Sequence, residues 1–328
     1  MARGESPVFR PQLIERQRRL EAARAAQPAS RDLARLLEEV DAALARMAEG
    51  TFGVCETCHE AIEPERLAAD PLTRFCIDHL SESERRALER DLELAVEIQT
   101  SLLPQRQFQA GEWETWYQYN PAGPVSGDYC DLIPADGAGL YFFAGDVAGK
   151  GVAASLLMSH LHAIFRSLAP FGLSVEEMIA RANRVFCEST GAAEYATLLC
   201  GRAGAGGAIE VANAGHCPPL LIHRGGAEDI EASGIPMGMF CSVEYPARRI
   251  KLDPGDCLVV YTDGLTEARD ASDREYGFER LASVLARCHG LTAQAIAERA
   301  LADLRQFLSG SRPSDDLTVL VLRRNAAA

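Results

Sequence analysis

The stretch that decides the fold of this 328-residue chain is GLYFFAGDVAGKGVAASLLMSHL, residues 139–161. It opens with a short apolar run that has the length and residue types of a β-strand, and this run ends at Asp146. A segment with helical spacing follows over residues 150–168, after a turn that contains Gly149. The sequence therefore predicts an aspartate at the junction between a strand and a helix.

Other short apolar runs surround this junction. They are WETWYQY, DYCDLI, YATLLCG, AIEVANAG, PLLIH, CLVVYTDG and DLTVLVLR. The pattern also predicts helices over 174–189, 277–287 and 293–308, and a hairpin turn over 202–207. Because strands and helices are grouped rather than strictly alternating, we expect an α+β fold with helices layered over mainly antiparallel sheets.

Three further aspartates lie beside apolar strands as Asp146 does: Asp128 in SGDYCD, Asp263 in VVYTDG and Asp315 in SDDLTV. A carboxylate in this position is costly unless something neutralises it, although aspartate is also a common turn residue. Carboxylates without accompanying His and Cys ligands are typical of Mg²⁺ or Mn²⁺ sites. We therefore expect the four aspartates to converge on hard divalent cations.

A short insert contains the spacing Cys55-x2-Cys58-x17-Cys76-x2-His79. Two ligand pairs of this kind can close a tetrahedron around one Zn²⁺ ion. Such a short segment has too small a core to fold alone, so metal binding would supply the missing free energy. We predict a closed structural zinc site, with His59 as the alternative fourth ligand.

The N-terminal third of the chain is predicted to be helical on both sides of this insert. Residues 8–49 read as two helices interrupted near Pro28, and a third helix is expected over 81–103. The third helix carries a narrow apolar stripe of Leu88, Leu92, Ala95, Ile98 and Leu102. A stripe of this kind suits a coiled-coil seam or a connector, and packing on its own domain is the alternative. The expected domains are N-terminal helices 1–50, a zinc finger 51–80, a helical linker 81–104 and a larger domain 105–325.

Composition restricts the possible functions. The chain has 33 Lys and Arg against 47 Asp and Glu, a formal net charge of −14, although residues 1–26 are locally basic. Such an acidic body is a poor general binder of nucleic acids. No run approaches the ~18 apolar residues of a membrane-spanning helix, and the N-terminus lacks the apolar core of a signal peptide. We expect a cytoplasmic protein with no membrane partner, whose seven cysteines outside the insert are reduced thiols.

The motifs of the larger domain resemble those of a known enzyme family. In order they are AVEIQTSLLP, SGDYCD, GDVAGKGVAASLLMSHL, NAGHCPPLL, GIPMG, LDPGDCLVVYTDGLTEA, YGFERL and SDDLTVLVLR. Residues 93–323 thereby resemble the SpoIIE/RsbU branch of the PPM (type 2C) metal-dependent protein serine/threonine phosphatases. The resemblance implies a layered α-β-β-α sandwich with two Mn²⁺ or Mg²⁺ ions in a cleft at one edge.

The same resemblance implies roles for individual residues. Asp146 would bridge both ions, and the backbone carbonyl of Val147 would hold the second ion. Asp263 and Asp315 would complete the shell of the first ion, while Asp128 would reach the other side. Two such ions neutralise a phosphate and activate a water for in-line attack on phosphorus.

Four other residues near these motifs have alternative interpretations. Asp131 and Asp316 are reserve carboxylates, and Asp316 is expected mainly to orient the neighbouring turn. His216 in NAGH could act as a general acid, but the family motif favours a role in shaping its loop. Lys150 could contact the substrate phosphate or could be a solvated lysine at a helix start.

The stretch VDAALARMAEGTFGVCETCHEAIEPERLAADPLTRFCIDH resembles the zinc finger of the DksA/TraR family. This second resemblance covers residues 30–80, and members usually carry Cys at the position of His79. Some members act on RNA polymerase, which leaves an alternative function open. In that alternative the chain is an RNA polymerase-binding regulator, and the phosphatase fold is only a scaffold.

The phosphatase resemblance implies a substrate class and a form of regulation. Enzymes of this branch typically act on phosphoserine or phosphothreonine of small STAS-domain anti-sigma antagonists, and thereby release a sigma factor. A sensory module controls them through a helical linker, often in a dimer. We therefore expect a phosphorylated STAS-domain-like substrate, regulation by the zinc finger, and a homodimer formed through residues 81–103.

Overall fold

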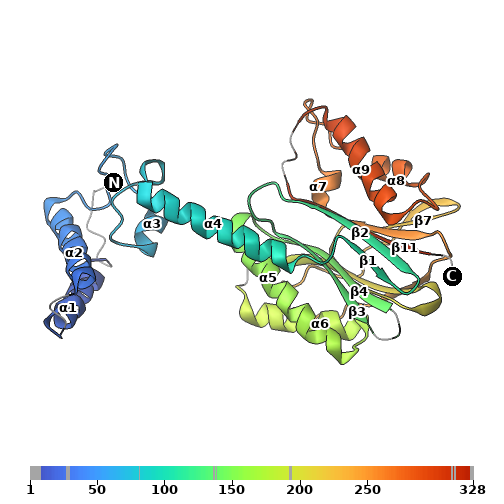
Figure 1. The fold of residues 1–328 in the computed structure, drawn as a ribbon, viewed down its shortest axis with the longest axis horizontal. Helices are drawn as coiled ribbons and strands as arrows, with labels where there is room; N and C mark the ends of the chain where they lie inside the picture. Colours follow the sequence, from blue (N-terminus) through green and yellow to red (C-terminus); the bar gives the residue numbers. More distant parts are fainter. Residues whose placement is uncertain are drawn as a thin grey trace. The chain divides into compact units, whose positions relative to one another are not determined.

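The computed structural model describes residues 9–26, 30–80, 82–135, 137, 139–191, 194–311, 313 and 315–325. The chain divides into two compact units, Met1–Asp91 and Leu92–Ala328, which are described separately below. Figure 1 shows the course of the chain through both units.

The first unit contains the predicted helical pair, α1 (Phe9–Ala26) and α2 (Arg31–Glu49). The side chain of Ser30 caps the start of α2 by accepting a hydrogen bond from the Leu33 amide, and Gly50 ends the helix in the left-handed conformation. One face of α2 is buried against Leu13 of α1; its buried residues are Leu37, Val40, Ala43 and Met47. This small core holds the two helices together.

Shorter elements follow α2. They are α3 (Pro64–Ala69) and a single 3₁₀ turn, η1 (Ile77–His79). The third predicted helix is present as α4 (Glu82–Leu102), which begins in the first unit and ends in the second. Leu88 and Ile98 of the predicted stripe are exposed, as is Leu94 outside it, whereas Gln99 is buried. The apolar stripe of α4 is therefore not packed away along its whole length.

The second unit contains two sheets whose named strands all pair antiparallel. The six-stranded sheet has the order β1-β2-β11-β10-β7-β8, and the five-stranded sheet has the order β3-β4-β5-β6-β9. The strands are β1 (Gln107–Ala110), β2 (Trp113–Asn120), β3 (Asp128–Ala135), β4 (Gly139–Val147), β5 (Ala196–Ala203), β6 (Ala208–Ala214), β7 (Leu220–His223), β8 (Gly226–Asp229), β9 (Arg248–Lys251), β10 (Cys257–Tyr261) and β11 (Leu317–Arg324).

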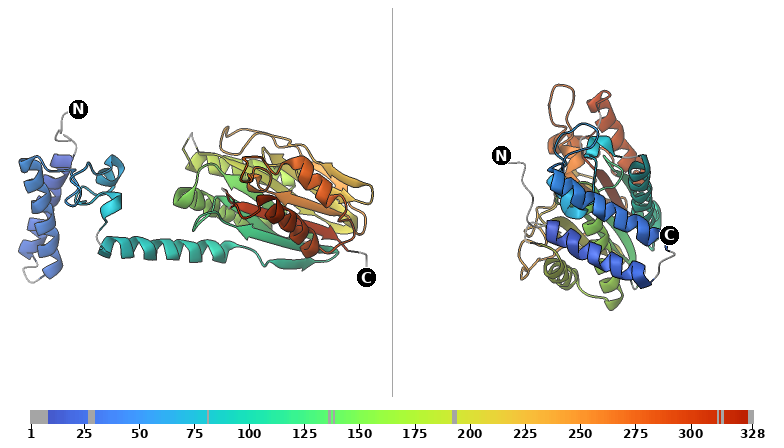
Figure 2. Two further views of the ribbon diagram at one scale, coloured as in Figure 1. Left: turned by 90° about the horizontal axis from the view of Figure 1, so that it is seen from above. Right: turned by 90° about the vertical axis from the view of Figure 1, so that its left-hand side faces the viewer.

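Helices cover the outer face of each sheet, as Figures 1 and 2 show. They are α5 (Gly151–Leu168), α6 (Val175–Ser189), α7 (Asp263–Thr266), α8 (Phe278–Leu285) and α9 (Ala293–Leu308), with 3₁₀ turns η2 (Ala169–Phe171) and η3 (Ala205–Gly207). One core packs α5 and α6 on the five-stranded sheet, a second packs α8 and α9 on the six-stranded sheet, and a third lies between the sheets. The predicted α+β, α-β-β-α sandwich is therefore confirmed.

Helix α5 packs on the five-stranded sheet, although its sequence is also long and apolar enough for a membrane-spanning helix. With the turn after it, Gly151–Phe171 is the one segment among the described helices that is long and apolar enough to cross a membrane. Met158, Leu161 and Phe165 of this helix are buried against the five-stranded sheet. The share of the apolar window that is buried is 39%, so packing on the sheet accounts for part of its apolar surface.

One prediction about the cysteines is wrong. Cys187 of α6 forms a disulfide with Cys241, with the Cα atoms 5.5 Å apart. We expected both to be reduced thiols because the N-terminus lacks the apolar core of a signal peptide. The spacing of the cysteines does not reveal which of them meet in the fold. The Asn183 side chain makes a second link at this place: it accepts a hydrogen bond from the Gly238 amide at 2.9 Å and donates one to the Phe240 carbonyl at 2.8 Å.

Candidate functional site

Two of the four predicted metal-binding aspartates lie directly opposite each other. Asp128 is the first residue of β3, Asp146 lies at the end of β4, and the antiparallel register pairs the two residues. Side chains of directly paired residues project from the same face of a sheet. The two carboxylates therefore share one face and one end of the five-stranded sheet.

Asp128 is buried and is anchored by two threonines from the neighbouring sheet. Thr262, which follows β10, donates from Oγ1 to Asp128 Oδ2 at 2.9 Å, and Thr318 of β11 donates to the same oxygen at 2.5 Å. Burial raises the pKa of Asp128 well above its usual range; the Thr318 hydrogen bond opposes this rise and the charge of Asp146 adds to it. The described residues donate only to Oδ2, which leaves Oδ1 available to a cation.

Asp146 and Asp263 lie in a field of like charges. Burial, followed by repulsion from Asp263 and Asp315, raises the pKa of Asp146 to about 7. Burial and the charge of Asp315 likewise raise the pKa of Asp263. A divalent cation relieves such repulsion and favours the ionised carboxylates. The three residues come from separate segments of the chain, yet they act on one another as neighbours.

These aspartates are spaced more widely than the ligands of a single zinc ion. Among the described residues, no three of them have ligand atoms that all lie within 4.8 Å of one another. Ions that share a bridging carboxylate in a two-metal site lie about 3.5–4 Å apart, so their outer ligands are farther from each other than the ligands of one ion. This spacing is compatible with the two-ion site that the sequence predicts.

Asp315 and Asp316 are adjacent in sequence but have different environments. The ammonium group of Lys150 contacts Asp315 Oδ2 at 2.8 Å. The Asp316 carboxylate instead accepts hydrogen bonds from the backbone amides of Ala122 at 2.7 Å and Gly127 at 3.0 Å. Asp316 therefore holds the loop that leads into β3, whereas Asp315 is held by Lys150 and by the backbone amide of Asp316, which donates to Asp315 Oδ1 at 3.0 Å.

Two glycines allow the segments of the site to approach closely. A Cβ atom on Gly127 would lie 3.0 Å from the carbonyl oxygen of Val147 and 3.2 Å from Asp146 Oδ1. A Cβ atom on Gly264 would lie 1.9 Å from the carbonyl oxygen of Asp316, which is impossible without backbone movement. The sequence pattern does not mark these glycines as part of the site, although both directly adjoin a predicted aspartate.

His216 is buried and shapes the loop in which it lies. Its backbone amide donates to the Asn213 side chain at 2.7 Å, and the Asn213 amide group donates to the His216 carbonyl at 3.0 Å. The ring atom Nδ1 lies 3.0 Å from the Thr197 hydroxyl. Burial lowers the pKa of His216 to about 4, so the ring is neutral at pH 7. These contacts favour the loop-shaping interpretation over that of a general acid.

Asp131 is bound to a cationic side chain instead of facing the four aspartates. Arg166 of α5 donates two hydrogen bonds to its carboxylate, at 2.8 and 2.7 Å. His162 Nε2 also lies 3.7 Å from this carboxylate. The buried Asp131 therefore fixes α5 on the five-stranded sheet, and it is not available as a reserve metal ligand.

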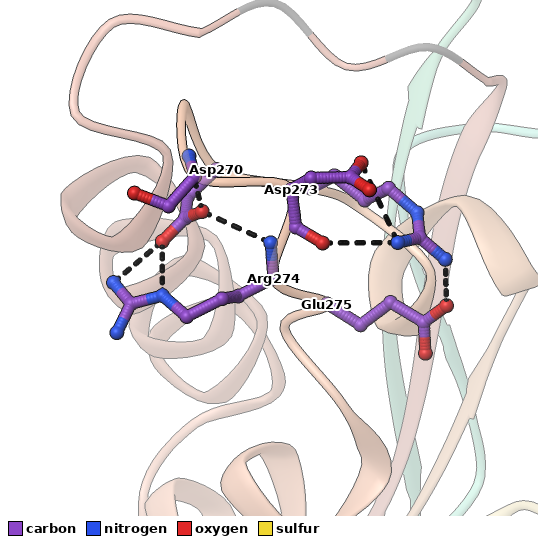
Figure 3. Close-up of polar contacts among 6 residues, drawn as sticks. Asp270, Asp273, Arg274 and Glu275 are labelled. Carbon is purple, nitrogen blue, oxygen red and sulfur yellow. Dashed lines mark hydrogen bonds and ion pairs between the residues drawn. The ribbon is translucent and has the colours of Figure 1, made fainter.

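A second acidic group, in the loop after α7, is neutralised internally (Figure 3). Asp270 accepts two hydrogen bonds from the Arg274 guanidinium, at 2.8 and 2.6 Å, and two from backbone amides. Arg269 pairs with Glu275 and donates to the Asp273 carbonyl at 3.0 Å. This loop is a closed network of ion pairs, so its carboxylates do not extend the metal centre.

The zinc-finger residues form a tight cluster in the first unit. The ligand atoms of Cys55, Cys58, Cys76 and His79 all lie within 4.8 Å of one another. Cys76 Sγ is 3.2 Å from His79 Nδ1 and 3.7 Å from Cys58 Sγ. His59 is not part of the cluster. Three thiolates and one imidazole fit the tetrahedral preference of zinc, and no position is left for a substrate.

Comparison with known sequences identifies both units. The sequence profile of the family described as Stage II sporulation protein E (SpoIIE) matches residues 136–325. The chain belongs to the SpoIIE family. A second profile, the prokaryotic DksA/TraR C4-type zinc finger, matches residues 50–79. The protein is therefore a SpoIIE-family, PP2C-like phosphatase domain preceded by a zinc finger of the DksA/TraR type.

Two curated relatives illustrate the extent of this similarity. Protein IcfG of Synechocystis sp. is 26% identical over 269 residues, which is 72% of this chain and 42% of IcfG. The phosphoserine phosphatase RsbU of Bacillus subtilis is 27% identical over 246 residues, or 73% of this chain and 72% of RsbU. The chain thus spans less than half of IcfG and most of RsbU.

Solved structures show the same fold. The RsbU and RsbW domains of Rv1364c from Mycobacterium tuberculosis are 26% identical, with a TM-score of 0.58 over 69% of this chain and 62% of theirs. The SiaA-PP2C domain of Pseudomonas aeruginosa is 18% identical, with a TM-score of 0.66 over 75% of this chain and the whole of that domain. RsbX, solved in complex with magnesium, has a TM-score of 0.52 at 16% identity, over 67% of this chain and 98% of RsbX.

Proposed function

We propose that this chain is a metal-dependent protein phosphatase that hydrolyses phosphoserine or phosphothreonine on a cytoplasmic regulatory protein. The observation that carries this proposal is the opposition of Asp128 and Asp146 across β3 and β4, within the electrostatic reach of Asp263 and Asp315. Membership of the SpoIIE family and the similarity to a phosphoserine phosphatase support it.

The residues of the site would divide the work as follows. Asp146 and the carbonyl of Val147 would hold two Mn²⁺ or Mg²⁺ ions, with Asp263 and Asp315 on one side and Asp128 on the other. Such ions, when bound, neutralise a phosphate dianion and lower the pKa of a water molecule.

The remaining groups of the site prepare the carboxylates for this role. Thr262 and Thr318 orient the Asp128 carboxylate before any ligand arrives. Lys150 forms an ion pair with Asp315. Once Asp315 binds metal, the Lys150 ammonium group would be able to leave this carboxylate and bind a substrate phosphate instead.

The substrate we propose is a phosphorylated STAS-domain anti-sigma antagonist, the class implied by the RsbU-like relatives. Such a substrate is a folded protein, so its phosphorylated residue has to be presented on an accessible loop. The carboxylates are arranged at the ends of β3 and β4 and at the start of β11, which is one edge of the sandwich.

We further propose that the zinc-finger unit regulates the phosphatase through α4. The Gln99 side chain donates to the Ser126 carbonyl at 2.7 Å and accepts from the Ser126 amide at 3.0 Å. Ser126 Oγ in turn accepts a hydrogen bond from the Asp128 amide at 3.0 Å. Rotation of α4, or a homodimer formed through its exposed Leu94 and Ile98, would therefore act on the segment that holds Asp128.

The experiment is a metal-dependence series on the full chain. Wild-type protein with added Mn²⁺ should hydrolyse p-nitrophenyl phosphate, and Asp146→Asn should reduce kcat/KM by about a thousandfold or more because the bridging ligand loses its charge. Zinc is quantified separately and should be unchanged in Asp146→Asn. Equal activity of the two proteins would overturn the assignment of the site.

A second candidate function rests on the match of residues 50–79 to the DksA/TraR finger. In that case the chain would bind RNA polymerase and the phosphatase fold would be a scaffold. Co-purification of RNA polymerase with wild-type chain, lost in Cys76→Ser and kept in Asp146→Asn, would favour this candidate. Metal-dependent hydrolysis without such binding would favour the first.

A further inference from the structure

A groove of about 930 Å³ runs between β2 and α9 in the second unit, and we call it the β2–α9 groove. Trp116, Gln118 and Asn120 line it; as alternate residues of β2 they project from one face of the six-stranded sheet. Arg106, which precedes β1, and Arg305 of α9 also line it. The groove therefore combines an extended strand surface with two cationic side chains.

Neither arginine is paired with a carboxylate in the part of the chain that the structure describes. The guanidinium of Arg106 lies over the ring of Trp116, 5.8 Å from its centroid. Both Arg106 and Arg305 are exposed. Glu298, the acidic residue among those that line the groove, accepts a hydrogen bond from Gln294 at 2.8 Å. Both guanidinium groups are therefore available to an anionic partner.

One end of the groove is lined by residues that lie close in sequence to a proposed metal ligand. Asn120 is paired with Leu317 in the register of β2 and β11, and both residues line the groove. Leu317 lies two residues after Asp315, a proposed metal ligand that does not itself line the groove. On the side of β2 that faces away from β11, the neighbouring strand is β1. The pairing of β1 with β2 reaches only as far as Trp116, so Gln118 and Asn120 have no β1 partner. An extended segment can follow β2 from there toward the metal centre.

We propose that the β2–α9 groove binds an acidic, extended segment of the phosphoprotein substrate while its phosphorylated residue occupies the metal centre. This inference rests on the proposed phosphatase function. Guanidinium groups bind carboxylates through paired hydrogen bonds, which gives both charge and geometric complementarity. Because the chain carries a net charge of −14, an acidic segment would be repelled by most of the surface. The groove is a local exception that sets substrate preference.

The test compares two synthetic phosphoserine peptides of equal length. One carries four Glu residues on each side of the phosphoserine, and the other carries Gln at the same positions. With wild-type full chain and Mn²⁺, we expect kcat/KM to be about tenfold higher for the Glu peptide, which corresponds to about 1.4 kcal/mol. This preference should fall as NaCl is raised to 0.5 M, because exposed ion pairs are screened.

Matched variants test whether the preference for the Glu peptide comes from the arginines of the β2–α9 groove. Arg305→Glu and Arg106→Glu should each remove most of it, while activity toward p-nitrophenyl phosphate stays unchanged. Arg299→Glu is the control: it makes the same charge change on α9 at an exposed residue that does not line the groove. Equal rates for the two peptides with wild type, or a preference that persists in both groove variants, would overturn the proposal.

A binding measurement separates this proposal from the phosphatase assignment. Fluorescein-labelled, unphosphorylated versions of the two peptides are titrated with the full chain, and anisotropy is recorded. Tighter binding of the Glu peptide that is lost in Arg305→Glu supports the groove even if no hydrolysis is found. Hydrolysis of p-nitrophenyl phosphate without any difference in peptide binding or turnover supports the phosphatase and refutes the groove.

Discussion

Thr318 donates its hydroxyl hydrogen to Asp128, 190 residues earlier in the chain. One residue belongs to β11 of the six-stranded sheet and the other to β3 of the five-stranded sheet. A side chain of the six-stranded sheet therefore holds a carboxylate of the five-stranded sheet in place. The backbone amide of Thr318 also donates to Thr262 Oγ1 at 2.9 Å, so the two threonines that bind Asp128 are linked to each other. The geometry of the metal centre thus depends on how the two sheets are packed together.

Thr318→Val should weaken Mn²⁺ binding because Asp128 loses one of its two orienting donors. Loss of such an outer partner typically costs 10–100-fold in metal affinity or activity. We expect a rise of about that size in the Mn²⁺ concentration that gives half-maximal p-nitrophenyl phosphatase activity. Thr318→Ser keeps the hydroxyl and serves as the control. A Val variant with the wild-type metal requirement would show that the hydrogen bond does not position the ligand.

The stability of the metal-free protein should fall as pH rises from about 4 to about 7. Asp146 has a pKa of about 7 in the folded chain, against an ordinary value of 3.8 for an aspartate, so the folded state binds more protons than the unfolded state over this interval. Stability is then fully present below the unfolded pKa and is lost as pH approaches the folded pKa, by an amount on the order of a few kcal/mol.

Chemical denaturation of EDTA-treated protein at several pH values measures this loss, and Asp146→Asn should flatten the slope. Added Mn²⁺ should reverse the trend, because the ion binds the ionised carboxylates and its affinity rises with pH. A metal-free protein that becomes more stable between pH 5 and 7 would contradict the predicted field of like charges.

His79→Ala should release zinc and unfold the finger. Structural zinc sites supply much of the folding free energy of small modules, and this cluster holds four ligand atoms within 4.8 Å. We expect zinc content, measured by mass spectrometry, to fall from about one ion per chain toward zero. His59→Ala is the matched control and should retain zinc, because His59 is not part of the cluster. Zinc loss in His59→Ala instead would reassign the fourth ligand.

Reduction of the Cys187–Cys241 disulfide should destabilise the phosphatase unit. The bond closes a loop with a sequence separation of 54 residues, for which chain-entropy arguments give about 4 kcal/mol and measured values are often lower. Dithiothreitol should therefore lower the midpoint of thermal unfolding of the wild type. The double variant Cys187→Ser/Cys241→Ser should unfold at the lower temperature with or without the reductant. If dithiothreitol leaves the midpoint of thermal unfolding of the wild type unchanged, the disulfide does not contribute to stability.

The sequence predicts those parts of the fold that have a strong local signal. The runs that become β2 to β7, β10 and β11 are rich in apolar or aromatic residues, and the helices after Lys150, Ser174 and Thr292 begin within one residue of expectation. β1, β8 and β9 were not predicted, because each has four residues and no apolar run. These edge strands exist only because a neighbouring strand offers hydrogen bonds.

For the candidate site, too, some residues could be predicted from the sequence and others could not. Asp128 and Asp146 could be singled out because each adjoins both an apolar strand and a glycine. The threonines that hold Asp128 could not, because a hydroxyl in a strand has no pattern that distinguishes an anchor from an ordinary β-former. The pairing of Cys187 with Cys241 was missed for a related reason: it depends on how α6 packs, which no local spacing records.

Gly264 places a limit on how this centre can change. With the Asp316 carbonyl oxygen 1.9 Å from where a Cβ atom would stand, even alanine would force the turn after Asp263 away from the segment that carries Asp315. The two ligands are thus held at a backbone-to-backbone distance that only the smallest residue permits. A single methyl group at position 264 would displace this turn, so a chain that kept every aspartate in its sequence could still lose the arrangement that brings Asp263 and Asp315 together.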